Sequence, residues 1–193
     1  MENADQALFI WLNSLAGNFA TFDSVVVWVA SDHLVPVSLS LTLVALWFTG
    51  ANKDVRERHQ VALFVALTSM ALSSLVVLII NGFYERLRPF DVMDVTLLFY
   101  RPTDPSFPAN SAAAAFALGA AIWLVNRRVG TAMLAAAVVY GLSRVIAGVH
   151  FPLDVLTGWL IAAAVTLAVF RLKDLVMPVL RAVIRVARIL CLA

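Results

Sequence analysis

Four side chains suited to phosphate chemistry lie close together in an otherwise apolar stretch: Ser143, Arg144, His150 and Asp154. A histidine can attack phosphorus, a carboxylate can orient it, and a guanidinium group can hold the anion. If Arg144 closes one helix and Asp154 lies in the first turn of the next, His150 falls at the mouth between them. Ionisable residues in membrane sequence indicate a function by default. For these four residues at this spacing, we favour a functional interpretation. The alternative is that they are charges at helix ends whose side chains extend to water.

The composition places the chain in a membrane. Of its 193 residues 62% are hydrophobic and 13% are charged, with a mean hydropathy of +0.91, whereas ordinary domains carry about 25% charged residues. The sequence therefore predicts a single membrane-embedded domain over residues 1–193. The net charge of +2 does not indicate nucleic acid, because the basic residues are sorted by membrane side. The one cysteine, Cys191, excludes an internal disulfide and a cysteine-based metal site, and nothing calls for a metal or other cofactor.

Apolar stretches predict an all-α integral membrane protein, a bundle of six transmembrane helices with a C-terminal amphipathic helix. Crossing about 30 Å of hydrocarbon takes about 20 apolar residues. The predicted spans are residues 6–31, with a soft break at Gly17-Asn18, and then 34–50, 61–80, 111–125, 129–149 and 152–170. In the tail, 171–193, Arg181, Arg185 and Arg188 form a stripe opposite an apolar face, which predicts a helix lying on an anionic membrane surface.

The basic residues predict the orientation of these spans, because cytoplasmic loops carry an excess of Lys and Arg. Ten of the fourteen lie in residues 51–60, the turn at 126–128 and the tail. Six spans place these regions on one side, together with the N-terminus, and that side is predicted to be cytoplasmic. The remaining four are Arg86, Arg88, Arg101 and Arg144. They lie on the outer side, where an anionic ligand would account for them.

Residues 81–110 form the only long polar stretch, and a loop of this length between membrane helices is usually functional or disordered. Its apolar run Val95 to Tyr100 suggests that part of the loop packs onto the protein, in one interpretation as a short helix. Both ends of the loop are predicted to converge with the connection after the fifth span on the outer face. The fourth span begins after Pro108, and a helix N-terminus offers free N–H groups to an anion.

These residues resemble the motifs of the type 2 phosphatidic acid phosphatase superfamily, in particular its bacterial undecaprenyl-diphosphatase branch. The third motif is Ser-Arg, five residues, His, three residues and Asp, and it is matched in full by residues 143–154. The first motif ends in Arg-Pro, matched by Arg88-Pro89. The second motif, commonly Ser-Phe-Pro-Ser-(Asp/Asn/Gly)-His, is similar to Ser-Phe-Pro-Ala-Asn-Ser at 106–111. The order, the spacing and the six-span frame agree along essentially the whole chain.

The resemblance implies metal-independent dephosphorylation of a lipid phosphate or diphosphate at the membrane surface. His150 would attack phosphorus to give a phosphohistidine, and Asp154 would orient it. Arg88 and Arg144 would neutralise the phosphoryl oxygens, and preorganised charge of this kind usually contributes most to catalysis. The implied partners are the lipid substrate and the membrane, without nucleic acid, and the oligomeric state stays open. The implied location is the bacterial inner membrane, with the site on the outer face and both termini cytoplasmic.

Three positions depart from the family motifs. Asn81 stands where the first motif has a lysine, Ala109 where the second has a phosphate-binding serine, and Ser111 where the second has the acid histidine. General acid help is worth about 10²–10⁴ in rate, and a serine hydroxyl is too weak an acid to replace it. The loss of the acid slows the cleavage of a diphosphate least, because a phosphate leaving group needs a proton less than an alkoxide does.

The predicted site therefore comprises catalytic and phosphate-binding positions. The catalytic positions are His150, Asp154 and Ser111, the last as the position of the family acid. The phosphate-binding positions are Arg88, Arg144, Asn81, Ala109, Asn110 and Arg86. Arg86 could supply the charge of the missing lysine. Asp104, Glu85 or His33 could stand in for the missing acid.

Two functions stay open. The first is an integral-membrane phosphatase, with undecaprenyl diphosphate as the favoured substrate, and the retained nucleophile–carboxylate pair supports it. The second is a catalytically impaired relative, natural or engineered, that binds or moves a lipid phosphate without cleaving it. The residues at 81, 109 and 111 favour this second function. The sequence does not separate undecaprenyl diphosphate from other lipid phosphates.

Overall fold

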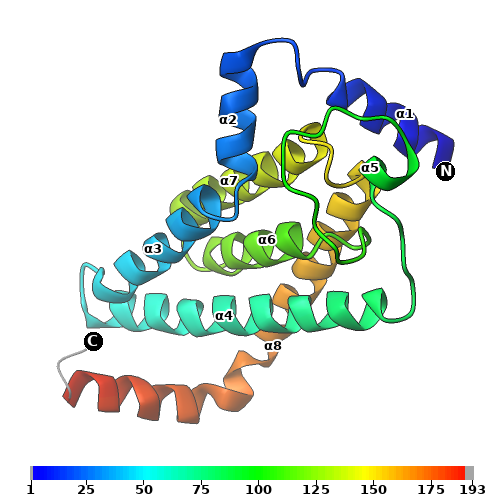
Figure 1. Cartoon of the computed structure of the whole chain (residues 1–193). Coiled ribbons are helices and arrows are strands. Elements are labelled where there is room, and N and C mark those ends of the chain that lie inside the picture. The colour runs from blue at the N-terminus through cyan, green and yellow to red at the C-terminus, as the bar shows by residue number, and fades with distance from the viewer. Residues whose placement is uncertain (1, 190–193) are drawn as a thin grey trace.

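The computed structural model describes residues 2–189, in which all regular structure is helical (Figure 1). The helices are α1 (Glu2–Asn13), α2 (Ala20–Ala30), α3 (Leu34–Phe48), α4 (Lys53–Asn81), α5 (Pro89–Val92), α6 (Asn110–Trp123), α7 (Arg127–Ile146) and α8 (Pro152–Ile189). The predicted all-α membrane fold is confirmed. One long loop, residues 82–109, joins α4 to α6 and contains the single turn α5.

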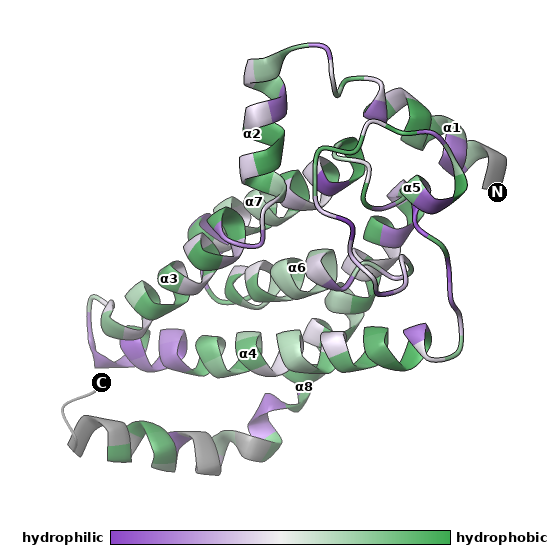
Figure 2. Ribbon diagram, in the orientation of Figure 1, coloured by the Kyte–Doolittle hydropathy of each residue, from purple (hydrophilic) through white to green (hydrophobic). Residues whose placement is uncertain are grey.

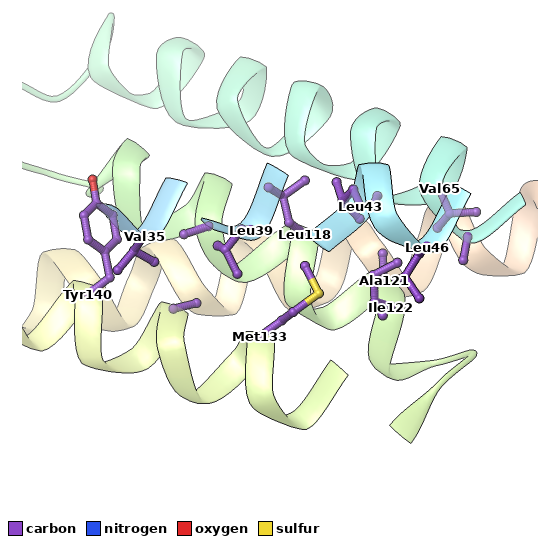
Figure 3. Packing of buried hydrophobic residues seen from close by; sticks show 14 residues of the cluster. Val35, Leu39, Leu43, Leu46, Val65, Leu118, Ala121, Ile122, Met133 and Tyr140 are labelled. Carbon is purple, nitrogen blue, oxygen red and sulfur yellow. The ribbon is translucent and has the colours of Figure 1, made fainter. Parts of the chain in front are cut away.

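Helix α6 lies at the centre of the bundle and packs against α4, α7 and α8. Its sequence is rich in alanine, and Ala113, Ala117 and Ala121 are fully buried. Small residues let neighbouring backbones approach closely, as helix packing in a bilayer favours. The largest apolar cluster lies between α3, α4, α6 and α7, where Leu118 and Met133 are among the buried side chains (Figure 3).

Within residues 2–189, three helical segments are long and apolar enough to cross a membrane: α4, α7 and residues Pro152–Leu175 of α8. Helices α2 and α3 meet these criteria together, but their axes are bent by 47°, and α6 is a shorter apolar helix. The second to sixth predicted spans therefore each correspond to one helix, namely α3, α4, α6, α7 and α8. The count of six crossings stays a prediction.

The predicted first span, residues 6–31, is divided into two helices at the soft break predicted at Gly17-Asn18. It contains α1 and α2, which are separated by residues 14–19. Gly17 in this connection has φ +83°, a conformation that glycine adopts without the penalty of a Cβ. An added Cβ would also lie 3.3 Å from the side chain of Thr96. The chain therefore turns here, and α1 packs against α7 and α8 at the end of the bundle where α7 ends and α8 begins (Figure 1).

The loop 82–109 packs back onto the bundle, as its apolar run predicts. Leu97, Leu98 and Phe99 lie against buried residues of α2 and of the α7–α8 connection. The run is not helical, which corrects the interpretation of a short helix. The physical reason is that its backbone has other partners: the N–H of Leu98 donates to the Ala147 carbonyl oxygen at 3.1 Å.

The three basic regions meet at one end of the bundle, as predicted. A cavity of about 540 Å³ at this end is lined by residues of α4, α6 and α8, including Arg58, Leu124 and Lys173. Arg181 forms an ion pair of 3.2 Å with Glu57. Figure 2 shows hydrophilic residues here at the start of α4 and again in the loop at the opposite end, with more apolar helices between them. Which end faces the cytoplasm stays a prediction.

The tail is a continuation of α8, which runs through Pro178 to Ile189 rather than starting a new helix. The side chains of Arg185 and Arg188 and the whole of Cys191 lie outside the described part of the chain. The amphipathic surface helix therefore stays a prediction.

Gly130→Ala is expected to destabilise the bundle, because an added Cβ would overlap the backbone of Trp123 at the α6–α7 turn. Overpacking of this kind typically costs about 1–3 kcal/mol. The matched control is Gly82→Ala at the end of α4, where an added Cβ would lie 3.4 Å from its nearest neighbour, the Ile79 carbonyl oxygen. Thermal unfolding in detergent is expected to show a lower midpoint for Gly130→Ala alone. Equal midpoints would contradict this packing.

Candidate active site

His150 lies in the short connection between α7 and α8. Helix α7 ends at Ile146, Gly148 has φ +84°, and α8 begins at Pro152, whose ring suits the first position of a helix. An added Cβ at Gly148 would lie 3.0 Å from the Thr96 carbonyl oxygen, so the loop 82–109 closes over this connection. His150 is consequently held with only 3% of its surface exposed.

The neighbours of His150 assign the proton of its imidazole ring. Nδ1 lies 3.0 Å from the carbonyl oxygen of Ser106, which can only accept, so Nδ1 carries the proton and donates it. Nε2 lies 3.3 Å from Nη1 of Arg88, which can only donate. The lone pair of the ring is therefore on Nε2, and it faces a guanidinium group.

Burial holds the pKa of His150 well below its usual range, and the charges of Arg88 and Arg144 lower it further. The hydrogen bond to the Ser106 carbonyl opposes this shift, because it favours a protonated Nδ1. The imidazole is therefore neutral near neutral pH. A neutral ring with its lone pair on Nε2 is the state that a nucleophile needs.

Arg88 precedes α5 and is fixed in place by the residues around it. Its Nε donates to the carbonyl oxygen of Asp104 at 2.9 Å, and its Nη2 donates to Oδ1 of the same residue at 3.0 Å. Its Nη1 also donates to the carbonyl oxygen of Val149 at 3.1 Å. The Arg88 side chain is buried, whereas that of Asp104 is 62% exposed. The guanidinium is thus held next to Nε2 of His150 mainly by backbone oxygens.

Arg144 lies in the last turn of α7, as predicted, and its Nη1 carries the hydrogen bonds described for its side chain. Nη1 donates to Oδ1 of Asp32 at 2.7 Å, to the Tyr140 hydroxyl at 2.8 Å and to the Ala30 carbonyl oxygen at 3.2 Å. The Nε atom is buried and has no hydrogen-bond partner within the described residues. That edge of the guanidinium is chemically suited to an anionic oxygen.

Asp154 is fully buried in the first turn of α8. Its Oδ2 accepts from the Ser106 hydroxyl at 2.5 Å and from the Phe151 N–H at 3.0 Å, and its Oδ1 accepts from Arg86 at 2.6 Å. Ser106 lies between Asp154 and His150, with its hydroxyl on the first and its carbonyl on the second. The described link between Asp154 and the imidazole therefore passes through Ser106, and the orienting role of Asp154 stays a prediction.

Both terminal nitrogens of Arg86 donate to carboxylates, and its predicted binding of phosphate stays a prediction. Nη1 donates to Asp154 at 2.6 Å, and Nη2 donates to Oδ2 of Asp5 at 2.7 Å. The guanidinium also lies over the ring of Phe151, 4.1 Å from its centroid. Arg86 therefore compensates the charges of two buried carboxylates.

Asn81 and Ala109 hold the loop in place around the site. With its amide nitrogen turned to face these acceptors, Asn81 donates to the carbonyl oxygens of Val77 at 3.3 Å and Phe107 at 2.7 Å. It thus ties the end of α4 to the loop. Ala109 is buried, and its N–H donates to the backbone carbonyl oxygen of Asp154 at 3.0 Å. Both residues make structural contacts, and their predicted binding of phosphate stays a prediction.

Asn110 and Ser111 form the start of α6, at the point where a helix N-terminus was predicted. Asn110 is exposed. The Ser111 hydroxyl is buried near the Tyr140 hydroxyl but has no hydrogen-bond partner within residues 2–189. A serine here thus leaves a polar group unpaired at the position of the family acid.

The three candidates for a substitute acid lie in different environments. Asp104 is at the site through its ion pair with Arg88. Glu85 and His33 are exposed, and no described hydrogen bond links either of them to His150. Among residues 2–189, no group of three or more His, Cys, Asp or Glu side chains is arranged to hold a metal ion.

The sequence did not point to Asp5 or Asp32, and it named Ser106 only as part of the second motif, although each contacts a predicted site residue. Asp5 and Asp32 pair with arginines that are far away in the chain. A weak signal existed for Asp5, since it lies four residues before Phe9 on a mostly apolar helix, where a charge needs a partner. Asp32 lies between the first two predicted spans, and its position beside Arg144 depends on the tertiary fold.

Comparisons with known proteins bear on the family and the fold of this chain. Residues 62–177 match the model of the PAP2 superfamily, a range that contains all three predicted motifs. The undecaprenyl-diphosphatase BcrC of Bacillus subtilis is 27% identical over 179 residues, which cover 93% of this chain and 89% of the relative. The bacitracin transport permease protein BcrC of Bacillus licheniformis is 28% identical over 163 residues, covering 84% and 77%. The crystal structure of Aquifex aeolicus LpxE has a TM-score of 0.67 at 24% identity, covering 86% of this chain and 94% of LpxE.

The free energy of unfolding is expected to fall as the pH drops below about 6.5. The unfolded chain protonates His150 in that range, whereas the folded chain keeps the ring neutral, so acid favours unfolding. His150→Gln removes this linkage. Unfolding in detergent between about pH 5 and pH 8 is expected to show the unaltered chain losing stability relative to the variant as the pH falls. A constant difference between the two proteins would contradict a buried neutral histidine.

Proposed function

Since the chain belongs to the PAP2 superfamily, we propose that it removes a phosphoryl group from a lipid phosphate or diphosphate in the membrane. Undecaprenyl diphosphate is the favoured substrate, because the relative from Bacillus subtilis is named as an undecaprenyl-diphosphatase and aligns over nearly its whole length. The observation that carries the proposal is the contact of 3.3 Å between Nε2 of His150 and Nη1 of Arg88. It brings a nucleophile and an anion-binding group to one point.

Residues 1–193 form one phosphatase-like domain in this proposal. Its place is the bacterial inner membrane, with the active site on the outer face and both termini in the cytoplasm. The position of the basic regions at the end of the bundle opposite His150 supports this orientation.

The reaction proceeds in two steps. In the first, the lone pair of Nε2 attacks the terminal phosphorus, the bond from phosphorus to the bridging oxygen breaks, and the lipid monophosphate leaves with that electron pair. The proton on Nδ1 stays on the ring, where the Ser106 carbonyl stabilises the positive phosphohistidine. In the second step, water attacks phosphorus, the N–P bond breaks, and Nε2 recovers its lone pair. Inorganic phosphate is released and one proton passes to solvent.

The charges of Arg88 and Arg144 stabilise both steps. The negative charge of the transferred phosphoryl group is spread over its non-bridging oxygens, and fixed cations next to them lower the barrier. The unpartnered Nε of Arg144 suits one such oxygen. Because Ser111 cannot donate a proton at neutral pH, a leaving group of low basicity is required. A diphosphate provides that leaving group, and an alkyl monophosphate does not.

The second candidate function is binding or transport of a lipid phosphate without cleavage. It is favoured by Ala109 and Ser111, which lack the serine and histidine of the second motif. One relative, from Bacillus licheniformis, bears the name of a transport permease. This function needs the arginines of the site, but it does not need Nε2 of His150.

The deciding experiment measures phosphate release from undecaprenyl diphosphate by the purified protein in detergent with EDTA. Three proteins are compared: the unaltered chain, Ser111→His combined with Ala109→Ser, and His150→Ala. We expect turnover by the unaltered chain, faster turnover by the restored double variant because it regains an acid worth about 10²–10⁴ for demanding leaving groups, and none by His150→Ala.

Turnover in the double variant alone would show that the unaltered chain binds the lipid without cleaving it. The absence of phosphate release by all three proteins would refute the phosphatase function. Turnover that survives His150→Ala would refute the phosphohistidine step.

Asp104→Asn is expected to lower KM for the anionic substrate. Its exposed carboxylate occupies Nη2 of Arg88, so a phosphate must displace it. An exposed ion pair is worth about 0.2–1 kcal/mol, which limits the decrease to about fivefold. Asp94→Asn is the matched control, since Asp94 is another exposed acid of the same loop. Steady-state kinetics in which both variants change KM equally would show a general effect of charge instead.

A further inference from the structure

Helix α1 presents a stripe of buried side chains at every fourth residue. Asp5, Phe9 and Asn13 face the bundle, whereas Trp11 is 63% exposed. Residues four apart lie on one face of a helix, so these three act as a single contact surface. Phe9 packs edge to face on Phe151, with ring centroids 5.3 Å apart. The stripe therefore lies along the connection that carries the nucleophile.

The two ends of this stripe make different contacts. At one end, Nδ2 of Asn13 donates to the carbonyl oxygens of Thr96 at 2.8 Å and Ile146 at 2.9 Å, and its Oδ1 accepts from the Thr96 N–H at 3.0 Å. These bonds join the loop 82–109 to the end of α7. They involve only neutral groups and do not reach the reacting atoms.

At the other end, Asp5 bridges two elements with its two oxygens. Oδ1 accepts from the N–H of Leu153 at 2.9 Å, a first-turn donor of α8 that has no partner inside its own helix. Oδ2 accepts from Nη2 of Arg86 at 2.7 Å. The side chain of Asp5 is only 1% exposed, so this carboxylate depends on those partners for its charge.

Arg86 transmits this constraint to Asp154. The guanidinium is a rigid plane, so fixing Nη2 on Asp5 also fixes the direction of Nη1, which donates to Asp154 at 2.6 Å. The side chain of Asp154 is fully buried, and a buried carboxylate without its cation is strongly disfavoured. One guanidinium thus serves two carboxylates from opposite ends of the chain.

We propose that Asp5 and Arg86 are positioning residues for the nucleophile. Asp5 holds Arg86, and Arg86 holds Asp154 ionised and in place. Asp154 in turn holds the hydroxyl of Ser106, whose carbonyl oxygen orients Nδ1 of His150. This inference rests on the proposed phosphatase function. Neither residue touches phosphate in this scheme, so their loss lowers kcat and leaves KM unchanged.

The test compares Asp5→Asn, Arg86→Gln, Arg86→Lys and Asn13→Ala in the phosphate-release assay, with thermal midpoints measured for each protein. Asparagine keeps an oxygen for the Leu153 N–H but turns an NH2 donor towards Arg86, so it breaks that one link. Residues that orient an active-site group typically contribute about 10- to 100-fold. We expect losses of that order in kcat for Arg86→Gln, a smaller loss for Asp5→Asn and a partial rescue by Arg86→Lys, all without a change in KM.

Asn13→Ala is the matched structural control, because it removes a buried polar contact of the same helix outside the charged network. It is expected to lower the thermal midpoint while leaving kcat unchanged. The double variant Asp5→Asn/Arg86→Gln is expected to be no slower than Arg86→Gln alone, because Asp5 acts through Arg86.

Three results would overturn the inference. A raised KM with unchanged kcat in Arg86→Gln would make Arg86 a phosphate ligand. Equal effects of Asp5→Asn and Asn13→Ala on kcat would reduce Asp5 to a structural contact. Turnover that is indifferent to both residues would refute their role and leave the phosphatase function intact. If the unaltered chain releases no phosphate, the same variants are made in the background of Ser111→His and Ala109→Ser. The absence of phosphate release in that background as well would refute the function and the inference together.

Discussion

A fully buried carboxylate in a membrane bundle must be satisfied by its surroundings, and Asp154 is that group. Its partners come from the loop 82–109, through Arg86 and the Ser106 hydroxyl, and from the backbone of Phe151. Its own backbone carbonyl accepts from Ala109 at the start of α6. Contacts with Asp154 therefore hold together three parts of the chain: the long loop, the start of α6 and the start of α8. The position of His150 follows from this, because Ser106 contacts both side chains. Its hydroxyl donates to Asp154, and its carbonyl oxygen accepts from Nδ1 of His150.

The sequence predicted what depends on local pattern. The apolar helices, the start of α6 after Pro108 and the junction that carries His150 all follow from hydropathy and from short-range spacing. For residues 6–31 it predicted only a soft break at Gly17-Asn18, because a run of apolar residues does not show how sharply the backbone turns. It did not predict the partners of the arginines. The pair Arg86–Asp5 is separated by 81 residues and Arg144–Asp32 by 112 residues, and no local pattern encodes such contacts.

The arginines at this end of the bundle were explained from the sequence by an anionic ligand alone. In the structure, Arg86, Arg88 and Arg144 each pair with a carboxylate of the chain. Arg101 instead lies over the ring of Phe90, 5.4 Å from its centroid. Their departure from the usual bias of basic residues towards the cytoplasmic side therefore has an internal cause as well. Each of these guanidiniums is therefore held in place by groups of the protein itself.

The same ion pairs join three guanidiniums to four carboxylates. Charges compensated at contact distance produce little field beyond the Debye length, which is about 8 Å at physiological ionic strength. Electrostatic steering, which accelerates association when one sign of charge dominates a surface, is correspondingly weak for these paired groups. An anion that binds at this end of the bundle would therefore have to exchange partners with these carboxylates at short range, and its association rate is expected to vary little with ionic strength.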